Sequence, residues 1–472
     1  MNAVLLALRN LLRNRRRSLA TLLAMIIGLS AVLVFGGYAS NVVHGLETAV
    51  VKRSGHLEIQ RQGYFRDGSD NPTSYGIAHY QRIIDRVKND PVLRPMLVVV
   101  TPTLEFGGIA GNFAAGVSRS VAATGVDVNE RNRMFLWNDY DEINYANPLA
   151  LAGTPDDSVI IGSGVARKLQ LCGPLKVLDC VQPPGPAPER AASASSIGSA
   201  ASAEPDDLLR LSDQERTSEP PKRETQIELL AANTRGAPNV INVNVVAADN
   251  VGVKEWDDVY LVMHLKEAQR LIYGSGPPQV TAIMLQLKHT SQVPVARARL
   301  EALLKGPFAD QPLELQDYDT LNPMYRQSVN FMASIFSFIA VLIGVIVLFT
   351  VGNTMSTAVA ERTVEIGTLR AIGLRRSGIR ALFMIEGILL GMAGAVLGAL
   401  CALVVAFLIN HSGLTWTPPG YIYAYLVQIS ILQDLPLLFG SAAGLVLVAA
   451  LSAWWPAGRA AGMDIVDALR HA

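Results

Sequence analysis

The chain has 472 residues, of which 50% are hydrophobic and 17% charged, and its 40 basic residues balance its 40 acidic ones. A neutral chain of this kind gives no reason to expect a nucleic acid partner. Three cysteines and seven scattered histidines, with no CxxC or HExxH motif, also make a zinc site improbable.

Residues 1–18 predict an amphipathic helix. Val4, Leu5 and Leu8 recur at helical spacing, whereas Arg9 and Arg13 fall largely on another side. A helix with one apolar and one basic face lies in the surface of a membrane. The alternative is that this segment extends the span that follows, although the polar run at 14–17 disfavours one straight helix.

Four apolar runs predict four transmembrane helices at residues 19–38, 329–357, 381–409 and 435–455. The first is longer than the apolar core of a signal peptide. The second belongs to a stretch without charge at 327–360, which would be about 51 Å long as a helix and so exceeds the roughly 30 Å hydrocarbon core. We therefore expect this span to continue beyond the membrane as a stalk.

Residues 39–328, between the first two spans, predict an α+β domain. Strand-like and helix-like runs alternate along it. The expected strands are 56–60, 97–101, 158–161, 240–246, 259–263 and 280–287, and the expected helices are 77–88, 266–272 and 293–304.

Within this domain, residues 181–223 are rich in Pro, Ala, Ser, Glu and Asp, which predicts a flexible insertion in a surface loop. Cys172 and Cys180 stand close to it and could form a disulfide on an oxidising side of the membrane, a point that the sequence leaves open. Cys401 falls inside the third span, where we expect it to pack.

The distribution of arginine predicts the orientation. Arginines cluster in residues 1–18 and again in 358–380, whereas 410–434 contains no Lys or Arg. By the positive-inside rule the first two segments are cytoplasmic, the large domain and the short 410–434 loop are on the outside, and the tail at 456–472 is cytoplasmic.

The third span carries a ridge of small residues at Gly387, Gly391, Gly394 and Gly398. Small residues at this spacing let helix backbones approach closely in lipid, either within one subunit or between two copies. Glu386 is the single charged residue in that span, so the four spans offer little to carry a coupling ion.

Enzyme motifs are also missing. There is no GxxxxGK[ST] sequence, so we expect no nucleotide site of the P-loop type in this chain. Gly162-Ser163-Gly164 resembles the start of a dinucleotide fingerprint, but Arg167 replaces its third glycine. We expect no catalytic residue, metal or cofactor here.

The charged segment after the second span, Glu361-Arg-Thr-Val-Glu-Ile-Gly-Thr-Leu-Arg-Ala-Ile-Gly373, resembles the MacB/LolC/FtsX group of ABC transporter permeases. The Glu386-Gly387 pair that opens a glycine-rich span, the start at 7–18 and the end at 455–470 are also similar to that group. In the large domain 54–59, 123–127 and 161–166 resemble recurring segments of the family, whereas the 181–223 insertion and Ile465, which stands where proline is common, depart from it.

The resemblance implies a bacterial inner-membrane permease subunit that forms a homodimer or related heterodimer and recruits a separate ATPase chain, which binds ATP and Mg. It implies a periplasmic domain of the MacB type and places a coupling helix at 358–380. The residues expected to couple to the ATPase are Glu361, Arg362, Glu365, Ile366, Gly367, Leu369, Arg370, Ala371, Ile372 and Gly373.

Two functions compete at this stage. The first is ATP-driven export or extraction of an envelope substrate, such as a lipoprotein, a lipid or a hydrophobic compound, with membrane lipid and a periplasmic adaptor or lipoprotein acceptor as further partners. The second is an FtsX-like regulator or scaffold that activates a periplasmic partner without transport. The size of the predicted external domain favours the first, and the substrate cannot be read from the sequence.

Overall fold

The computed structural model describes residues 3–13, 15–68, 71–140, 148–177, 224–416 and 424–464. They divide into two compact units. Of the described residues, those up to 47, from 323 to 416 and from 424 to 464 form the first unit, and those between 48 and 322 form the second. The predicted insertion at 181–223, Cys180 and residues 465–472 of the predicted tail lie outside the described residues.

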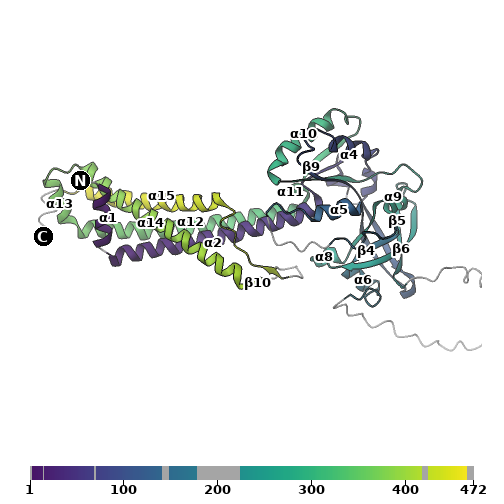
Figure 1. The fold of residues 1–472 in the computed structure, drawn as a ribbon, viewed down its shortest axis with the longest axis horizontal. Coiled ribbons are helices and arrows are strands. Elements are labelled where there is room, and N and C mark those ends of the chain that lie inside the picture. Colours follow the sequence, from purple (N-terminus) through teal and green to yellow (C-terminus); the bar gives the residue numbers. More distant parts are fainter. Residues whose placement is uncertain are drawn as a thin grey trace, which may run out of the picture. The chain divides into compact units, whose positions relative to one another are not determined.

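Long helices make up the first unit (Figure 1). Four of them are long and apolar enough to cross a membrane, judged by length and composition. The helices of this unit are α1 (Ala3–Arg13), α2 (Arg15–Ser54), α12 (Pro323–Glu361), α13 (Thr363–Ala371), α14 (Arg376–Ser412) and α15 (Leu435–Gly462), and a short pair of strands is formed by β10 (Thr415–Trp416) and β11 (Tyr425–Leu426).

The helices are longer than the apolar runs that predict them. The first span is predicted at 19–38, but α2 runs from Arg15 to Ser54 and its last turns continue into the second unit. The extra turns contain Asn41, Glu47 and Lys52, so the hydropathy falls while the helix goes on. Helix α1 ends at Arg13 and α2 begins at Arg15, and the two helices run in different directions (Figure 1).

The core of the helical unit is apolar and contains many small residues. Met25, Leu29 and Leu33 of α2 pack with side chains from the three other long helices. These partners are Val347, Val351 and Met355 of α12, Leu390, Ala395 and Ala402 of α14, and Leu445, Ala449 and Ala453 of α15.

The second unit contains a nine-stranded mixed sheet, which agrees with the predicted α+β character. Its strands are β1 (Leu57–Arg61), β2 (Leu97–Asn112), β3 (Val117–Val126), β4 (Ser158–Gly162), β5 (Gln226–Ala232), β6 (Pro238–Asp249), β7 (Tyr260–His264), β8 (Ala282–Leu287) and β9 (Leu313–Asp317). Its α-helices are α3 (Tyr64–Asp67), α4 (Tyr80–Lys88), α5 (Val128–Phe135), α6 (Ser163–Lys168), α8 (Lys254–Asp257), α9 (Leu265–Tyr273), α10 (Val293–Lys305) and α11 (Tyr318–Leu321). Short 3₁₀ turns lie at Pro72–Tyr75, Phe113–Ala115 and Thr290–Gln292.

The sheet has the order β3-β7-β4-β6-β5-β2-β8-β1-β9, and β3 also pairs with β2. This additional pairing closes six of the strands into a ring. Strand β2 belongs to both parts of the sheet, because residues 97–103 pair with β8 and residues 103–112 pair with β3. One core lies among the ring strands, α6 and α9, and a second lies between β1, β8, α4 and α10.

Candidate coupling site

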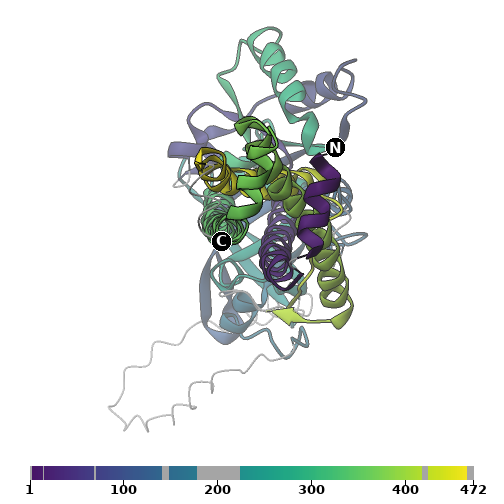
Figure 2. The ribbon, with the colours of Figure 1, turned by 90° about the vertical axis from the view of Figure 1, so that its left-hand side faces the viewer.

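The predicted coupling segment at 358–380 is divided by the structure into the end of α12, the separate helix α13 and the start of α14. Arg362 separates α12 from α13 with a non-helical backbone, φ −104° and ψ 18°. Gly373 lies just beyond α13 at φ +104°, a conformation that glycine adopts without the steric cost of a side chain. The result is a short helix held between two long ones (Figure 2).

One face of α13 is buried against the long helices. Ile366 is 3% exposed and belongs to a cluster with Val359 of α12, Phe383 of α14 and Ala457 of α15. Gly367 is also buried, and Leu369 packs against the same cluster. Because α13 contacts three long helices through this cluster, a displacement of α13 would be transmitted to them.

Apolar side chains near the start of α13 and just after its end are exposed to the surroundings. Ile372 is 80% exposed, Leu374 is 41% exposed and Val364 is 38% exposed. Ala371 and Gly373 beside them are exposed as well. Exposed apolar side chains that are gathered on one short element are typical of a protein contact.

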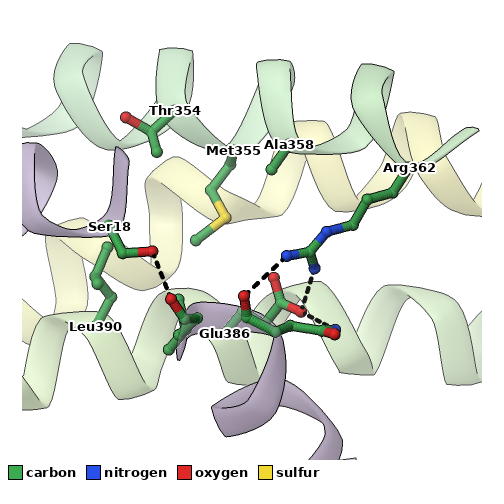
Figure 3. A pocket seen from close by; sticks show the side chains of 9 residues that line it. Ser18, Thr354, Met355, Ala358, Arg362, Glu386 and Leu390 are labelled. Atoms are coloured by element: carbon green, nitrogen blue, oxygen red, sulfur yellow. Dashed lines mark hydrogen bonds and ion pairs between the residues drawn. The ribbon is translucent and has the colours of Figure 1, made fainter. Parts of the chain in front are cut away.

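A buried ion pair joins Arg362, at the junction of α12 and α13, to Glu386 of α14 (Figure 3). The Nη1 atom of Arg362 donates to Oε1 of Glu386 at 3.0 Å, and the two residues are only 6% and 2% exposed. Asn10 of α1 joins them, because its Nδ2 donates to the same Oε1 at 2.6 Å and its backbone carbonyl accepts from Arg362 Nη2 at 3.1 Å. We call these three residues the buried triad, after the buried Arg362–Glu386 pair, although Asn10 itself is half-buried.

Arg362 and Ser18 also provide hydrogen-bond donors for backbone carbonyls at the C-terminal end of α1. The last four carbonyls of a helix have no partner within it. Arg362 donates to the carbonyl of Asn10, and Ser18 Oγ donates to that of Leu11 at 3.1 Å. A guanidinium group at this position also interacts favourably with the negative end of the helix dipole.

A small cavity adjoins the triad (Figure 3). Its volume is about 20 Å³, which is the size needed for one water molecule. It is lined by Asn10, Leu11, Ser18, Thr354, Met355, Ala358, Arg362, Glu386 and Leu390. The Nε atom of Arg362 is buried and has no hydrogen-bond partner within the described part of the chain.

Polar contacts at the surface tie α13 to two further elements. Arg13 of α1 forms an ion pair with Glu365 at 2.6 Å, and both side chains are about half exposed. Arg370 donates to the backbone carbonyl of Met463, just beyond α15. Glu361 is exposed at the end of α12.

Two arginines stack on tryptophan rings near the same end of the bundle. The guanidinium carbon of Arg380 lies 3.9 Å from the ring centre of Trp454, and that of Arg459 lies 3.6 Å from the ring centre of Trp455. The two indoles are more than half exposed. Cations and indole rings of this kind are typical of a membrane interface.

The four glycines of the predicted ridge, all in α14, contact helices of the same chain. A Cβ atom at Gly387 would lie 2.6 Å from Cβ of Ala453, and one at Gly391 would lie 2.9 Å from Cβ of Ala449. Toward α2, a Cβ at Gly394 would meet Met25 at 2.8 Å, and one at Gly398 would meet Leu29 at 3.0 Å. Of the two explanations left open by the sequence, these contacts support packing within one subunit.

Cys172 is buried at 4% exposure and is disulfide-bonded. Its expected partner, Cys180, lies outside the described residues, so the pairing stays a prediction. Cys401 is a free, exposed cysteine rather than a packed one, which corrects the expectation for the third span. No group of three His, Cys, Asp or Glu residues that could hold a metal lies within the described ranges.

The structure thus brings together Arg362, Glu365, Ile366 and Leu369 with side chains that sequence reasoning did not assign to the site. The missed residues are Asn10, Arg13 and Ser18, while Glu386 is noted in the sequence only as the one charge of its span. That isolated charge is the one sequence feature that could have identified the triad, since ionisable residues in spans mark functional sites.

Long apolar helices joined through a short, packed and partly exposed helix define a polytopic membrane protein with a candidate site for coupling to a partner. The family model described as FtsX-like permease C-terminal matches residues 334–465, which contain the whole of α13 and α14. This range therefore carries an FtsX-like permease domain.

Relatives with known names agree with this assignment. The chain is 26% identical over 243 residues to the lipoprotein-releasing system transmembrane protein LolC of Neisseria meningitidis, over 50% of this chain and 56% of LolC. It is 27% identical over 195 residues to the macrolide export ATP-binding/permease protein MacB of Neisseria gonorrhoeae, over 41% of this chain and 28% of MacB. It is 30% identical over 167 residues to the ABC transporter permease YtrF of Bacillus subtilis, over 34% of this chain and 35% of YtrF.

The resemblance to the MacB/LolC/FtsX group of ABC transporter permeases is confirmed by these matches. The matched stretches span about half of LolC and about a third or less of MacB and YtrF.

Proposed function

We propose that this chain is the permease subunit of an ABC transporter and that a separate ATPase chain docks on α13. The observation that carries this proposal is the two-sided character of α13. Ile366 anchors it to three long helices, while Ile372, Leu374 and Val364 stay exposed for a partner.

The length of the helices supports the transmission of movement. Helix α12 has 39 residues and α2 has 40, so each is roughly 60 Å long, about twice the thickness of the hydrocarbon core. Helix α2 continues without a break from the helical unit into the sheet-rich unit. In this proposal a movement of α13 that displaces α12 acts on the sheet-rich unit, to which the chain joins α12 at Pro323.

The remaining assignments follow from the family. In this proposal the ATPase binds ATP and Mg, a second permease copy completes the transporter, and the sheet-rich unit faces the periplasm from the inner membrane. The substrate is a component of the envelope, such as a lipoprotein, a lipid or a hydrophobic compound. The names of LolC and MacB, one a lipoprotein-releasing and the other a macrolide export protein, illustrate this range.

An FtsX-like regulator remains the second candidate, and one observation separates the two. The sheet-rich unit extends over residues 48–322 and has two hydrophobic cores. A unit of this size is suited to handling a substrate, whereas a regulator needs only a surface that contacts its partner. We therefore place transport first.

Replacing Ile372 by Asp tests the docking surface. Burying an unpaired charge against the ATPase should reduce co-purification of the two chains at least tenfold, because it costs several kcal/mol. Leu414→Asp is the matched control, since Leu414 is also exposed, at 55%, and follows the opposite end of α14. Equal recovery of the ATPase with the Ile372→Asp and wild-type chains would remove α13 as the docking site.

A further inference from the structure

Helix α1 is held at the coupling site by directed polar contacts as well as by apolar packing. The side-chain amide and the backbone carbonyl of Asn10 both form hydrogen bonds within the buried triad. Its last residue, Arg13, reaches Glu365 on α13. A helix that only lies on a membrane surface requires none of these directed contacts.

The position of Arg362 explains why the contacts matter. It is the residue at which α12 ends and α13 begins, so its backbone sets the angle between the two helices. Its side chain bonds to Glu386 of α14 and to Asn10 of α1. Hydrogen bonds to two other helices therefore hold the start of α13, and the Arg362–Glu386 pair among them is buried.

We propose that Asn10, Arg362 and Glu386 form a latch that holds α13 in a fixed orientation against α1, so that α1 is a positioning element of the coupling site. Its consequence rests on the proposed function: the latch determines how much of the movement of α13 reaches α12 and α14. The three residues position α13 and need not touch the ATPase or its nucleotide.

Cross-linking of the permease alone tests the latch directly. Arg13→Cys and Glu365→Cys are combined in a Cys401→Ser background, and a bifunctional thiol reagent with a short spacer joins them. With the latch intact, cross-linking should be fast, because the native side chains lie 2.6 Å apart. Adding Asn10→Ala should slow it at least fivefold, whereas Arg9→Ala, an exposed change on the same helix, should leave the rate unchanged.

A second variant separates positioning from folding. The pair Arg362→Met and Glu386→Leu replaces the buried charges by apolar side chains of similar size, a change that often preserves stability. This chain should insert and fold, yet its cross-linking should be as slow as that of the Asn10→Ala chain. Glu386→Gln keeps an oxygen acceptor and should give an intermediate rate. Wild-type rates in the Asn10→Ala chain or in the double variant would overturn the proposal.

ATP hydrolysis in nanodiscs supplies the functional readout. With the ATPase bound, Asn10→Ala should lower kcat several-fold and leave both the KM for ATP and the amount of bound ATPase unchanged. Arg9→Ala, an exposed change on the same helix, again serves as the control. An unchanged kcat would contradict a positioning role. Failure of the wild-type chain to bind any ATPase would instead contradict the proposed function, and the cross-linking rates would still decide whether the latch exists.

Discussion

Glu58 and His56 are buried two residues apart at the start of the sheet-rich unit, and their environments shift the two pKa values in opposite directions. Burial, followed by the neighbouring Glu105 carboxylate, raises the pKa of Glu58 to about 8, against a partial lowering by the hydrogen bond from Gln60 and by Arg131. Burial lowers the pKa of His56 to about 4, although Asp139 opposes this. Its Nδ1 atom accepts from the amide of Leu287 at 3.0 Å, which suits a neutral ring.

The substitution Glu58→Gln should remove a loss of stability that the wild-type chain undergoes as the pH rises from 4.5 to about 8. The folded chain retains a proton on Glu58 that the unfolded chain releases near pH 4.5, so the stabilising contribution is complete below pH 4.5 and disappears as the pH rises to about 8. One pKa unit corresponds to about 1.4 kcal/mol, so the loss amounts to a few kcal/mol.

Thermal unfolding of the full chain in nanodiscs, followed from pH 4.5 to pH 8.5, measures this effect. The difference between wild type and Glu58→Gln isolates Glu58, because His56 titrates in both chains. We expect the variant to be the more stable chain at pH 8.5, and a difference that does not change with pH would rule out a buried proton on Glu58.

At the scale of the element, α14 packs closely on its neighbours because glycine, which has no side chain, occupies the contact positions. Gly391→Ala should destabilise the helical unit by about 1–3 kcal/mol, because its new methyl group would lie 2.9 Å from Ala449. Gly344→Ala in α12 is the matched control, since no atom lies within 4 Å of the position of its Cβ. Unfolding by titration with a denaturing detergent compares the two. Equal midpoints would show that α14 and α15 are not packed as closely as described.

The sequence predicts an element correctly where a single local property, such as hydropathy, determines that element. The four spans follow from hydropathy, and β1, β4, β6, β7 and β8 from short apolar runs. Strands β3, β5 and β9 are not among the predicted strands. The first residues of β3 alternate between exposed and half-buried side chains of low hydrophobicity, and β3 is a strand because it pairs with β2. Helices α2 and α12 extend beyond the apolar segments that predict them, so hydropathy does not locate the ends of these helices.

The site was predictable in part for the same reason. The charged segment at 361–373 is continuous in sequence, so a local pattern is enough to predict it as a coupling segment. The buried triad joins residues that are 352 and 376 positions apart, as in the pairs Arg362–Asn10 and Asn10–Glu386. No local pattern relates Asn10 to Glu386, so only the packing of α1 on α14 and α12 reveals the contact.

At the scale of the whole molecule, orientation in the membrane is the largest open prediction. Single cysteines at Asp310 and Thr415, in a Cys401→Ser background, should react with an impermeant thiol reagent on intact spheroplasts. A cysteine at Ser377, in the arginine-rich segment, should not react until the membrane is permeabilised. All three positions are exposed, so differences in labelling report the side of the membrane. Labelling at Ser377 in intact spheroplasts would reverse the proposed topology.

The closed ring of strands and the long strand β2 have a consequence for how the sheet-rich unit responds to force. Thr103 pairs with Ala282 of β8 on one side and with Val126 of β3 on the other, so one backbone crosses from the ring into the open part of the sheet without a linker. A hinge between the two parts would require the hydrogen bonds around this residue to break. A force applied to one part of the sheet is therefore passed along β2 to the strands that pair with it in the other part.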